Sequence, residues 1–134
     1  MSGLLLDTHA FFWWCTEDIR LPKQVDRVIR GTDQPVYVSA VVPLELSLKQ
    51  RLGKISLPPE IAESPGRGIA DTVQEADFQE LAITFRHAEQ VKSIPLHHRD
   101  PFDHLLIAQA QVEGLTIVSI DEAFDRYDVP VLWA

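Results

Sequence analysis

The sequence predicts an α/β fold, namely a three-layer α/β/α sandwich around a central, mostly parallel sheet of four to five strands. Short apolar runs of strand length alternate along the chain with amphipathic segments of helical period. This alternation is typical of parallel strands that are joined by helices. Polar side chains of the Asp, Ser and Thr type stand where several apolar runs end, as is expected of helix N-caps and of ligand sites in such folds.

Composition and length fit a single folded domain over residues 1–134. A chain of 134 residues with 46% apolar residues is long enough to bury a core and too apolar for disorder. The longest uninterrupted apolar run, Ala10–Cys15, is too short to span a membrane, and no basic region precedes Leu4–Leu6 as it would in a signal peptide. The single cysteine cannot form an internal disulfide. We therefore expect a cytoplasmic protein without membrane association.

The charge balance by itself argues against a nucleic-acid partner. Twelve basic residues stand against twenty acidic ones, which gives a net charge of −8. The cations are grouped, however, and one group has spacings of three, four and three residues that predict a stripe on a single helix: Arg20, Lys23, Arg27 and Arg30. A solvated helix face is sufficient to explain this stripe, and contact with RNA is the alternative.

The first half of the chain predicts two strands with helices after each. The strands are continuous apolar runs of the kind found in the middle of parallel sheets. Asp7 and Ser39 have the side chains of helix N-caps, and Gly31 and Gly53 are placed to end helices. In chain order, we expect a strand over 3–7, a helix that includes 10–15, a helix over 22–30, a strand over 35–38 and a helix over 40–52.

The second half predicts three more strands. Pro and Gly residues divide the segment 57–76 into short pieces, with helices expected over 59–63 and 69–76. Thr84 can cap a helix, and Pro130 suits an edge strand because it cannot donate a ladder hydrogen bond. In chain order, we then expect a strand over 80–84, a helix over 85–91, a helix from 101 that ends at Gly114, a strand over 115–119, a short helix over 122–127 and an edge strand over 129–133.

The stretch His97–Ala110 turns from a polar loop into an apolar helix within a few residues. Asp100 has the chemistry of an N-cap, and Pro101 fits the first helical position. Asp103 then lies in the first turn, where the helix dipole favours an anion. Apolar residues three, four and seven positions further on nevertheless place Asp103 at the head of the buried stripe. A carboxylate there needs a partner, and a metal ion is one candidate.

Three other acids stand in comparable places. Asp7 and Asp121 each follow a predicted strand, where the role of N-cap is the structural alternative. Glu45 lies within the apolar stripe of the helix over 40–52, where a buried ion pair with Lys49 or another cation is the alternative. Each acid alone has a structural explanation, but two acids on apolar stripes together with two at strand ends favour a common site.

We expect Asp7, Glu45, Asp103 and Asp121 to converge at one edge of the sheet, because ligand sites of parallel α/β folds lie beyond the carboxyl ends of the strands. Four clustered carboxylates repel one another unless a cation lies among them, and oxygen ligands favour Mg²⁺ or Mn²⁺. Such ions activate water for attack at phosphate and would offset part of the charge that repels a polyanionic substrate.

Several stretches of the chain match one known family, and they span nearly its whole length. They are 4–9, 38–49, 52–55, 98–110, 119–121 and 131–133. The run Asp100-Pro101-Phe102-Asp103 is the most specific of them, whereas Asp7-Thr8-His9 alone would be a weak signal. By these residues the chain resembles the PIN-domain nucleases, and specifically the VapC-type toxins of bacterial type II toxin–antitoxin systems.

This resemblance implies a PIN-like fold and a function. Asp7, Glu45, Asp103 and Asp121 match the acidic metal-site positions of the family. The family is associated with Mg²⁺- or Mn²⁺-dependent endoribonuclease activity, often on tRNA or other structured RNA. Its members commonly form homodimers, and a cognate antitoxin inhibits them by occupying the groove of the active site. The resemblance thus implies a catalytic acidic cluster, an RNA substrate and an antitoxin partner.

The chain departs from the family pattern at three positions. Many members carry a Ser and a Trp shortly before the acid of the second helix, where Val42 and Leu44 stand here, and an Arg after the Asp-Pro-Phe-Asp run, where His104 stands. These departures leave the expected ligands intact and bear on how RNA or an antitoxin is held. They motivate an alternative, a degenerate PIN-like protein that binds RNA or an antitoxin without turnover.

A phosphotransfer domain is a third class that also places acids at strand ends. The residues argue against it, because no second acid stands two residues after Asp7 and no lysine directly follows the fourth predicted strand.

Overall fold

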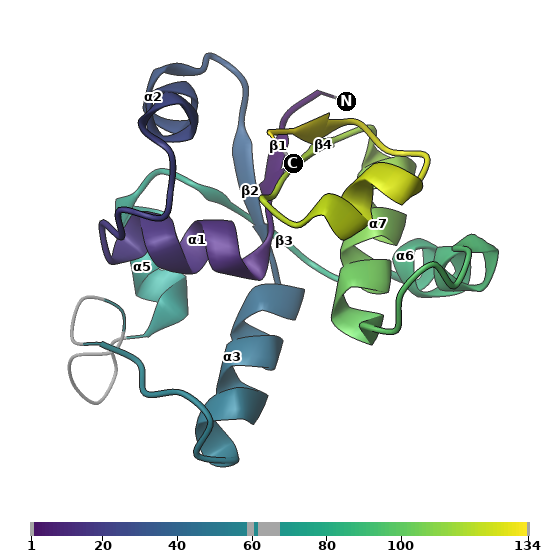
Figure 1. Cartoon of the computed structure of the whole chain (residues 1–134), viewed down its shortest axis with the longest axis horizontal. Coiled ribbons are helices and arrows are strands. Elements are labelled where there is room, and N and C mark those ends of the chain that lie inside the picture. The colour runs from purple at the N-terminus through teal and green to yellow at the C-terminus, as the bar shows by residue number, and fades with distance from the viewer. Residues whose placement is uncertain (1, 59–60, 62–67, 134) are drawn as a thin grey trace.

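A computed structural model describes residues 2–58, 61 and 68–133. Within this part of the chain, five strands form one sheet in the order β3-β2-β1-β4-β5, and every neighbouring pair is parallel (Figure 1). The strands are β1 (Leu4–Leu6), β2 (Val36–Ser39), β3 (Gln79–Leu81), β4 (Thr116–Val118) and β5 (Val131–Leu132). The predicted parallel sheet is confirmed, including the edge position of the last strand.

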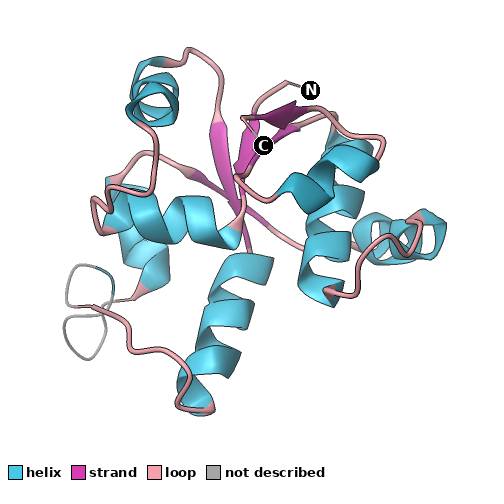
Figure 2. Ribbon diagram, viewed as in Figure 1, coloured by secondary structure: helices cyan, strands magenta, loops and turns pink. Residues whose placement is uncertain are grey.

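Helices cover both faces of this sheet, so the predicted three-layer sandwich is also confirmed (Figure 2). None of the described helices has the length and the apolar character needed to cross a lipid bilayer. The α-helices are α1 (Thr8–Cys15), α2 (Lys23–Gly31), α3 (Val41–Arg51), α5 (Ile69–Glu75), α6 (Phe85–Gln90) and α7 (Pro101–Glu113), and two short 3₁₀ helices are η1 (Val91–Ser93) and η2 (Glu122–Arg126).

The central strand β1 divides the core into two halves because its side chains alternate between the faces of the sheet. Leu4 and Leu6 pack with α1, α2 and α5 on one face, and Leu5 packs with α7 and η2 on the other. All three leucines are buried. Since β1 pairs with β2 on one side and β4 on the other, its carboxyl end, followed by Asp7, lies in the middle of the sheet edge.

Two sequence-based expectations are wrong, and a third lies mostly outside the described residues. The strand expected over 80–84 is β3, which ends at Leu81, and the following Ala82 carbonyl accepts a hydrogen bond from Gln109 instead of a ladder partner. Arg20 was expected on the same helix as Arg30, but it precedes Pro22, the N-cap of α2, so the predicted four-residue basic stripe is wrong. The helix expected over 59–63 lies, apart from residue 61, outside the described residues.

A polar network built on three buried side chains joins β2 to α6 and α7. The Ser39 hydroxyl donates to Gln109 Oε1 at 2.5 Å and accepts from the Val41 amide at 3.0 Å. Gln109 Nε2 in turn donates to the Ala82 carbonyl and to His87 Nδ1, both at 3.3 Å. Because Ser39, Gln109 and His87 are inaccessible to solvent, each lost partner would leave a buried polar group unsatisfied. The network therefore fixes α7 against the sheet.

Replacing Gln109 tests this network. Gln109→Leu keeps the volume but leaves the Ser39 hydroxyl and the Ala82 carbonyl without this partner, so we expect a loss of about 2 kcal/mol in the free energy of unfolding. The measurement is urea denaturation. Gln74→Leu, at an exposed position of α5, is the matched control and should change stability by no more than roughly 0.5 kcal/mol. Equal effects of the two substitutions would contradict a structural role for the network.

Candidate active site at the carboxyl ends of the strands

Asp7 stands directly after the central strand and begins α1. Its carboxylate accepts a hydrogen bond from the Ala10 amide at 2.8 Å, so the structural prediction of an N-cap is confirmed. The residue is only 4% exposed, which is unusual for an N-cap carboxylate. Burial raises the pKa of Asp7, hydrogen bonds from Ser119 and Ala10 lower it, and the charge of Asp121 raises it again. Asp7 is thus a desolvated carboxylate beside another acid.

Ser119 connects Asp7 to Asp121. The Ser119 hydroxyl oxygen accepts from the Asp121 backbone amide at 2.9 Å, and its side chain lies close enough to Asp7 to lower the pKa of that carboxyl. Asp121 follows β4, is exposed, and caps η2 by accepting from the Ala123 amide at 2.9 Å. Both Asp7 and Asp121 therefore act as caps and still lie close to one another. Sequence reasoning missed Ser119, although its place at the end of a predicted strand was a usable signal.

Asp103 reaches the same region from the first turn of α7. Asp100 caps this helix by accepting from the Phe102 amide at 2.9 Å, and Pro101 occupies its first position, as predicted. The Asp103 side chain is 15% exposed, and its Oδ2 lies 3.0 Å from His98 Nε2. Burial, with smaller contributions from the charges of Asp100 and Asp7, raises the pKa of Asp103 to about 7, although the hydrogen bond from His98 lowers it.

Glu45 lies on α3 and is 5% exposed, as its place in the apolar stripe predicts. Its Oε1 accepts from the Thr8 hydroxyl at 2.7 Å, and its Oε2 pairs with Lys49 Nζ, one turn further along the helix, also at 2.7 Å. The ion pair considered as the structural alternative is therefore present. Because Thr8 is the residue after Asp7, the Thr8–Glu45 hydrogen bond ties α3 to the same end of β1.

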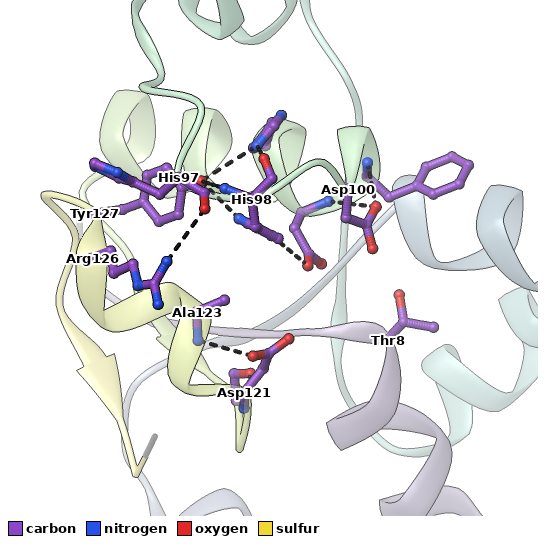
Figure 3. Close-up of polar contacts among 12 residues, drawn as sticks. Thr8, His97, His98, Asp100, Asp121, Ala123, Arg126 and Tyr127 are labelled. Carbon is purple, nitrogen blue, oxygen red and sulfur yellow. Dashed lines mark hydrogen bonds and ion pairs between the residues drawn. The ribbon is translucent and has the colours of Figure 1, made fainter.

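The four acids thus lie toward the same edge of the sheet, although different contacts link them to one another. Asp7 interacts electrostatically with both Asp103 and Asp121, and Glu45 joins them through Thr8. In Figure 3, Thr8, Asp100 and Asp121, which come from three separate elements, lie around the same region. A carboxylate set of this kind fits a hard divalent cation in its donor chemistry.

These four acids do not form a preformed metal site. Over the described ranges, no group of three His, Cys, Asp or Glu side chains is placed so that it could hold a metal ion without rearrangement. Two of the carboxylates contact nitrogen-bearing side chains, Glu45 with Lys49 and Asp103 with His98. The other two, Asp7 and Asp121, accept from backbone amides. A cation would therefore have to share these oxygens with Lys49 and His98 or displace them.

The three departures from the family pattern have distinct surroundings. Val42 is buried in the core, whereas Leu44 is 45% exposed on the opposite side of α3. His104 is buried, and its Nε2 donates to the His98 carbonyl at 2.7 Å. Val42 thus serves packing, Leu44 faces solvent, and His104 braces the loop before α7.

Two cations of the expected basic stripe are engaged within the chain. Arg20 pairs with Asp18 at 2.7 Å and lies over the ring of Trp13, and Arg30 pairs with Asp26 at 3.0 Å. These ion pairs favour the structural explanation of the two arginines over a free basic surface.

Comparison with known proteins adds a family match and a fold match. The family model described as PIN domain matches residues 4–130. No curated protein sequence matches the chain. The solved structures that it resembles include the DNA-bound VapBC of Salmonella typhimurium, with 19% identity, 98% of each chain covered and a TM-score of 0.68.

Two further solved structures are similar over almost the full chain. One is VapBC2 of Rickettsia felis bound to a DNA fragment from its promoter, with 13% identity, 98% of each chain covered and a TM-score of 0.62. The other is FitAcB of Neisseria gonorrhoeae, with 20% identity, 96% of each chain covered and a TM-score of 0.62. At these identities the likeness establishes the fold.

The raised pKa of Asp103 predicts that the metal-free protein loses stability as pH rises. The pKa is about 7 in the folded state but about 3.9 in an unfolded chain, so between these values the folded state binds the proton more tightly. The stabilising contribution of the protonated group is complete below about pH 4 and is lost as pH rises through about 7. Asp103→Asn removes the titrating charge and keeps an acceptor for His98.

We therefore expect Asp103→Asn to be more stable than the wild type at pH 8 by on the order of 2 kcal/mol, and the two proteins to differ little near pH 4. Urea denaturation in the presence of a chelator measures this difference. Asp125→Asn, which removes an exposed acid of η2, is the control for loss of a surface carboxylate. A constant difference between Asp103→Asn and wild type across this pH range would contradict the account of Asp103.

Proposed function

The chain belongs to the PIN domain family, and on that premise we propose that it is a metal-dependent endoribonuclease that acts as the toxin of a toxin–antitoxin pair. The observation that carries this proposal is the burial of the Asp7 carboxylate within the electrostatic reach of Asp103 and Asp121. Burying carboxylates next to one another costs folding free energy. Buried, mutually repelling acids of this kind are typical of functional sites.

In this proposal, Asp7, Glu45, Asp103 and Asp121 hold Mg²⁺ or Mn²⁺ and are the catalytic residues. The chemistry that such an ion supplies is activation of water and stabilisation of the charge that develops at a phosphodiester. The substrate class is RNA, including tRNA, as the family resemblance implies. The acids themselves position the cation against the scissile phosphate.

Neighbouring side chains orient these acids. The Thr8 hydroxyl holds one oxygen of Glu45, and Lys49 holds the other, so the Glu45 side chain has a single orientation. Ser119 contacts both Asp7 and the backbone of Asp121, which keeps the end of β1 beside the end of β4. Lys49 also offsets part of the negative charge that would repel an RNA backbone.

The toxin role and its partners come from the family and from the neighbouring structures. Those structures are two VapBC proteins, both bound to DNA, and FitAcB. By analogy, we propose that a cognate antitoxin binds this chain over the acidic site, that the chain forms a homodimer, and that it acts in the cytoplasm as one domain over residues 1–134.

The contacts of Glu45 and Asp103 favour a second candidate function. Because Lys49 and His98 already bond to these two acids, the chain is also compatible with a degenerate PIN-like protein that binds RNA or an antitoxin without turnover. Isothermal titration with Mn²⁺ separates the two candidates. The nuclease should bind Mn²⁺ in a saturable manner, and the degenerate protein should show little binding.

Cleavage assays on Asp103→Asn test the nuclease directly. The substitution removes one proposed ligand charge, so we expect RNA cleavage with Mg²⁺ or Mn²⁺ to fall by at least about 100-fold, the scale for loss of one electrostatic contact to a transition state. Expression of the variant alone should also relieve growth arrest. Asp125→Asn should cleave and arrest growth as the wild type does. Full activity of Asp103→Asn would overturn the assignment.

A further inference from the structure

A continuous chain of hydrogen bonds runs from Tyr127, the residue after η2, through His98 to the Asp103 carboxylate. We propose that His98, held by Tyr127 and His104, is a positioning residue that aims the Asp103 carboxylate at the cation. This inference rests on the proposed function, because it concerns the orientation of a proposed metal ligand. His98 touches Asp103, and it acts on the reaction only through that acid.

The distances determine which atoms carry the protons. His104 Nε2 lies 2.7 Å from the His98 carbonyl oxygen, which can only accept, so this nitrogen carries a proton. The His98 backbone amide donates to Tyr127 Oη at 3.1 Å, and Tyr127 Oη lies 2.7 Å from His98 Nδ1. His104 Nε2, at 3.4 Å from Tyr127 Oη, is a donor and cannot accept the phenolic proton.

This leaves His98 Nδ1 as the acceptor for the Tyr127 proton among the hydrogen bonds of the described residues. A neutral imidazole whose Nδ1 accepts must carry its proton on Nε2. His98 Nε2 therefore donates to Asp103 Oδ2, at 3.0 Å. Every donor in the chain of contacts then has an acceptor, and Asp103 Oδ1 takes no part in this network. The network thus selects one tautomer of His98 and one orientation of Asp103.

Packing fixes the rings as firmly as the hydrogen bonds do. His104 and Tyr127 are each 6% exposed, and Phe124 beneath them is fully buried. The His98 ring meets His104, Tyr127 and Phe124 edge to face, with ring centroids 5.0, 5.4 and 6.3 Å apart. Figure 3 shows His98 beside Tyr127. Because the three neighbours come from α7, from η2 and from the residue after η2, the His98 side chain cannot rotate without disturbing the contact between these helices.

The network also accounts for His104, the departure from the family pattern beside Asp103. A histidine at this position of α7 reaches back over the first turn to the His98 carbonyl, which lies six residues earlier in the chain. In doing so it anchors the backbone of the residue that orients Asp103. His104 therefore helps to hold Asp103 in place through His98. Where many family members have an arginine, this chain has a histidine that bonds to the His98 carbonyl.

Imidazole nitrogen spectra of the metal-free wild type test the tautomer without any substitution. Long-range ¹⁵N–¹H correlation should show His98 and His104 as the Nε2–H tautomer. Tyr127→Phe removes one oxygen and keeps the ring, so the preference of His98 for the Nε2–H tautomer should weaken to what the Asp103 contact alone supports. His104 should keep its own tautomer through the His98 carbonyl. A His98 proton on Nδ1 in the wild type, or no change of His98 in Tyr127→Phe, would overturn the proposal.

Mn²⁺ titration of His98 variants tests the effect on the acid. His98→Ala should weaken Mn²⁺ binding by about 10-fold or more, the usual cost of losing a group that orients a metal ligand. His98→Gln, which restores an N–H near the same place, should recover part of the affinity. Leu96→Ala is the control, because Leu96 lies in the same loop as His98 and is 85% exposed. Circular dichroism checks that each variant is folded.

The outcomes separate this inference from the proposed function. Equal Mn²⁺ affinities of wild type, His98→Ala and Leu96→Ala would overturn the role of His98 and leave the nuclease proposal intact. Absence of Mn²⁺ binding in the wild type would overturn both. Reduced binding in His98→Ala with partial recovery in His98→Gln supports the positioning role, whatever RNA proves to be the substrate.

Discussion

The burial of the Asp7 carboxylate at the end of the central strand is the constraint around which this part of the molecule is built. Its burial follows from topology, because β1 has a neighbour on each side and a helix begins immediately after it. An ionised carboxylate in such a place needs compensation. The Ala10 amide, the Ser119 hydroxyl and the charge of His9 supply some of it, whereas the nearby acids add repulsion. In the proposed function, a divalent cation supplies the remaining compensation.

Much of this arrangement could be predicted from local rules. The helix-start signals of Asp100 and Pro101, and the apolar residues after Asp103, were enough to place this acid at a helix start and on its inner face. The partners could not be predicted, because they depend on tertiary distances. Tyr127 lies 29 residues from His98, and Glu45 lies 37 residues from Thr8. No periodicity in the sequence connects such pairs.

The error in the basic stripe has a similar origin. The spacing from Arg20 to Arg30 fits a helical face, but the helix begins only after Pro22. Arg20 lies before the helix and pairs with Asp18. Spacing is informative only within a single element. Conversely, Lys49 was one of the partners considered for Glu45, and that ion pair is present because both residues lie on α3, four positions apart. The prediction about Glu45 and Lys49 was therefore right because both residues lie on one helix, and the prediction about Arg20 was wrong because it lies outside α2.

The central claim is that the acids around Asp7 form a site for a divalent cation, and thermal unfolding at increasing Mn²⁺ concentration tests it most directly. A ligand that binds only the folded state stabilises it by about 2.7 kcal/mol at 100 times its dissociation constant. The account predicts that the melting temperature of the wild type rises steadily with Mn²⁺, and that Asp7→Asn shows little or no rise. An equal rise in the two proteins, or none in the wild type, would contradict it.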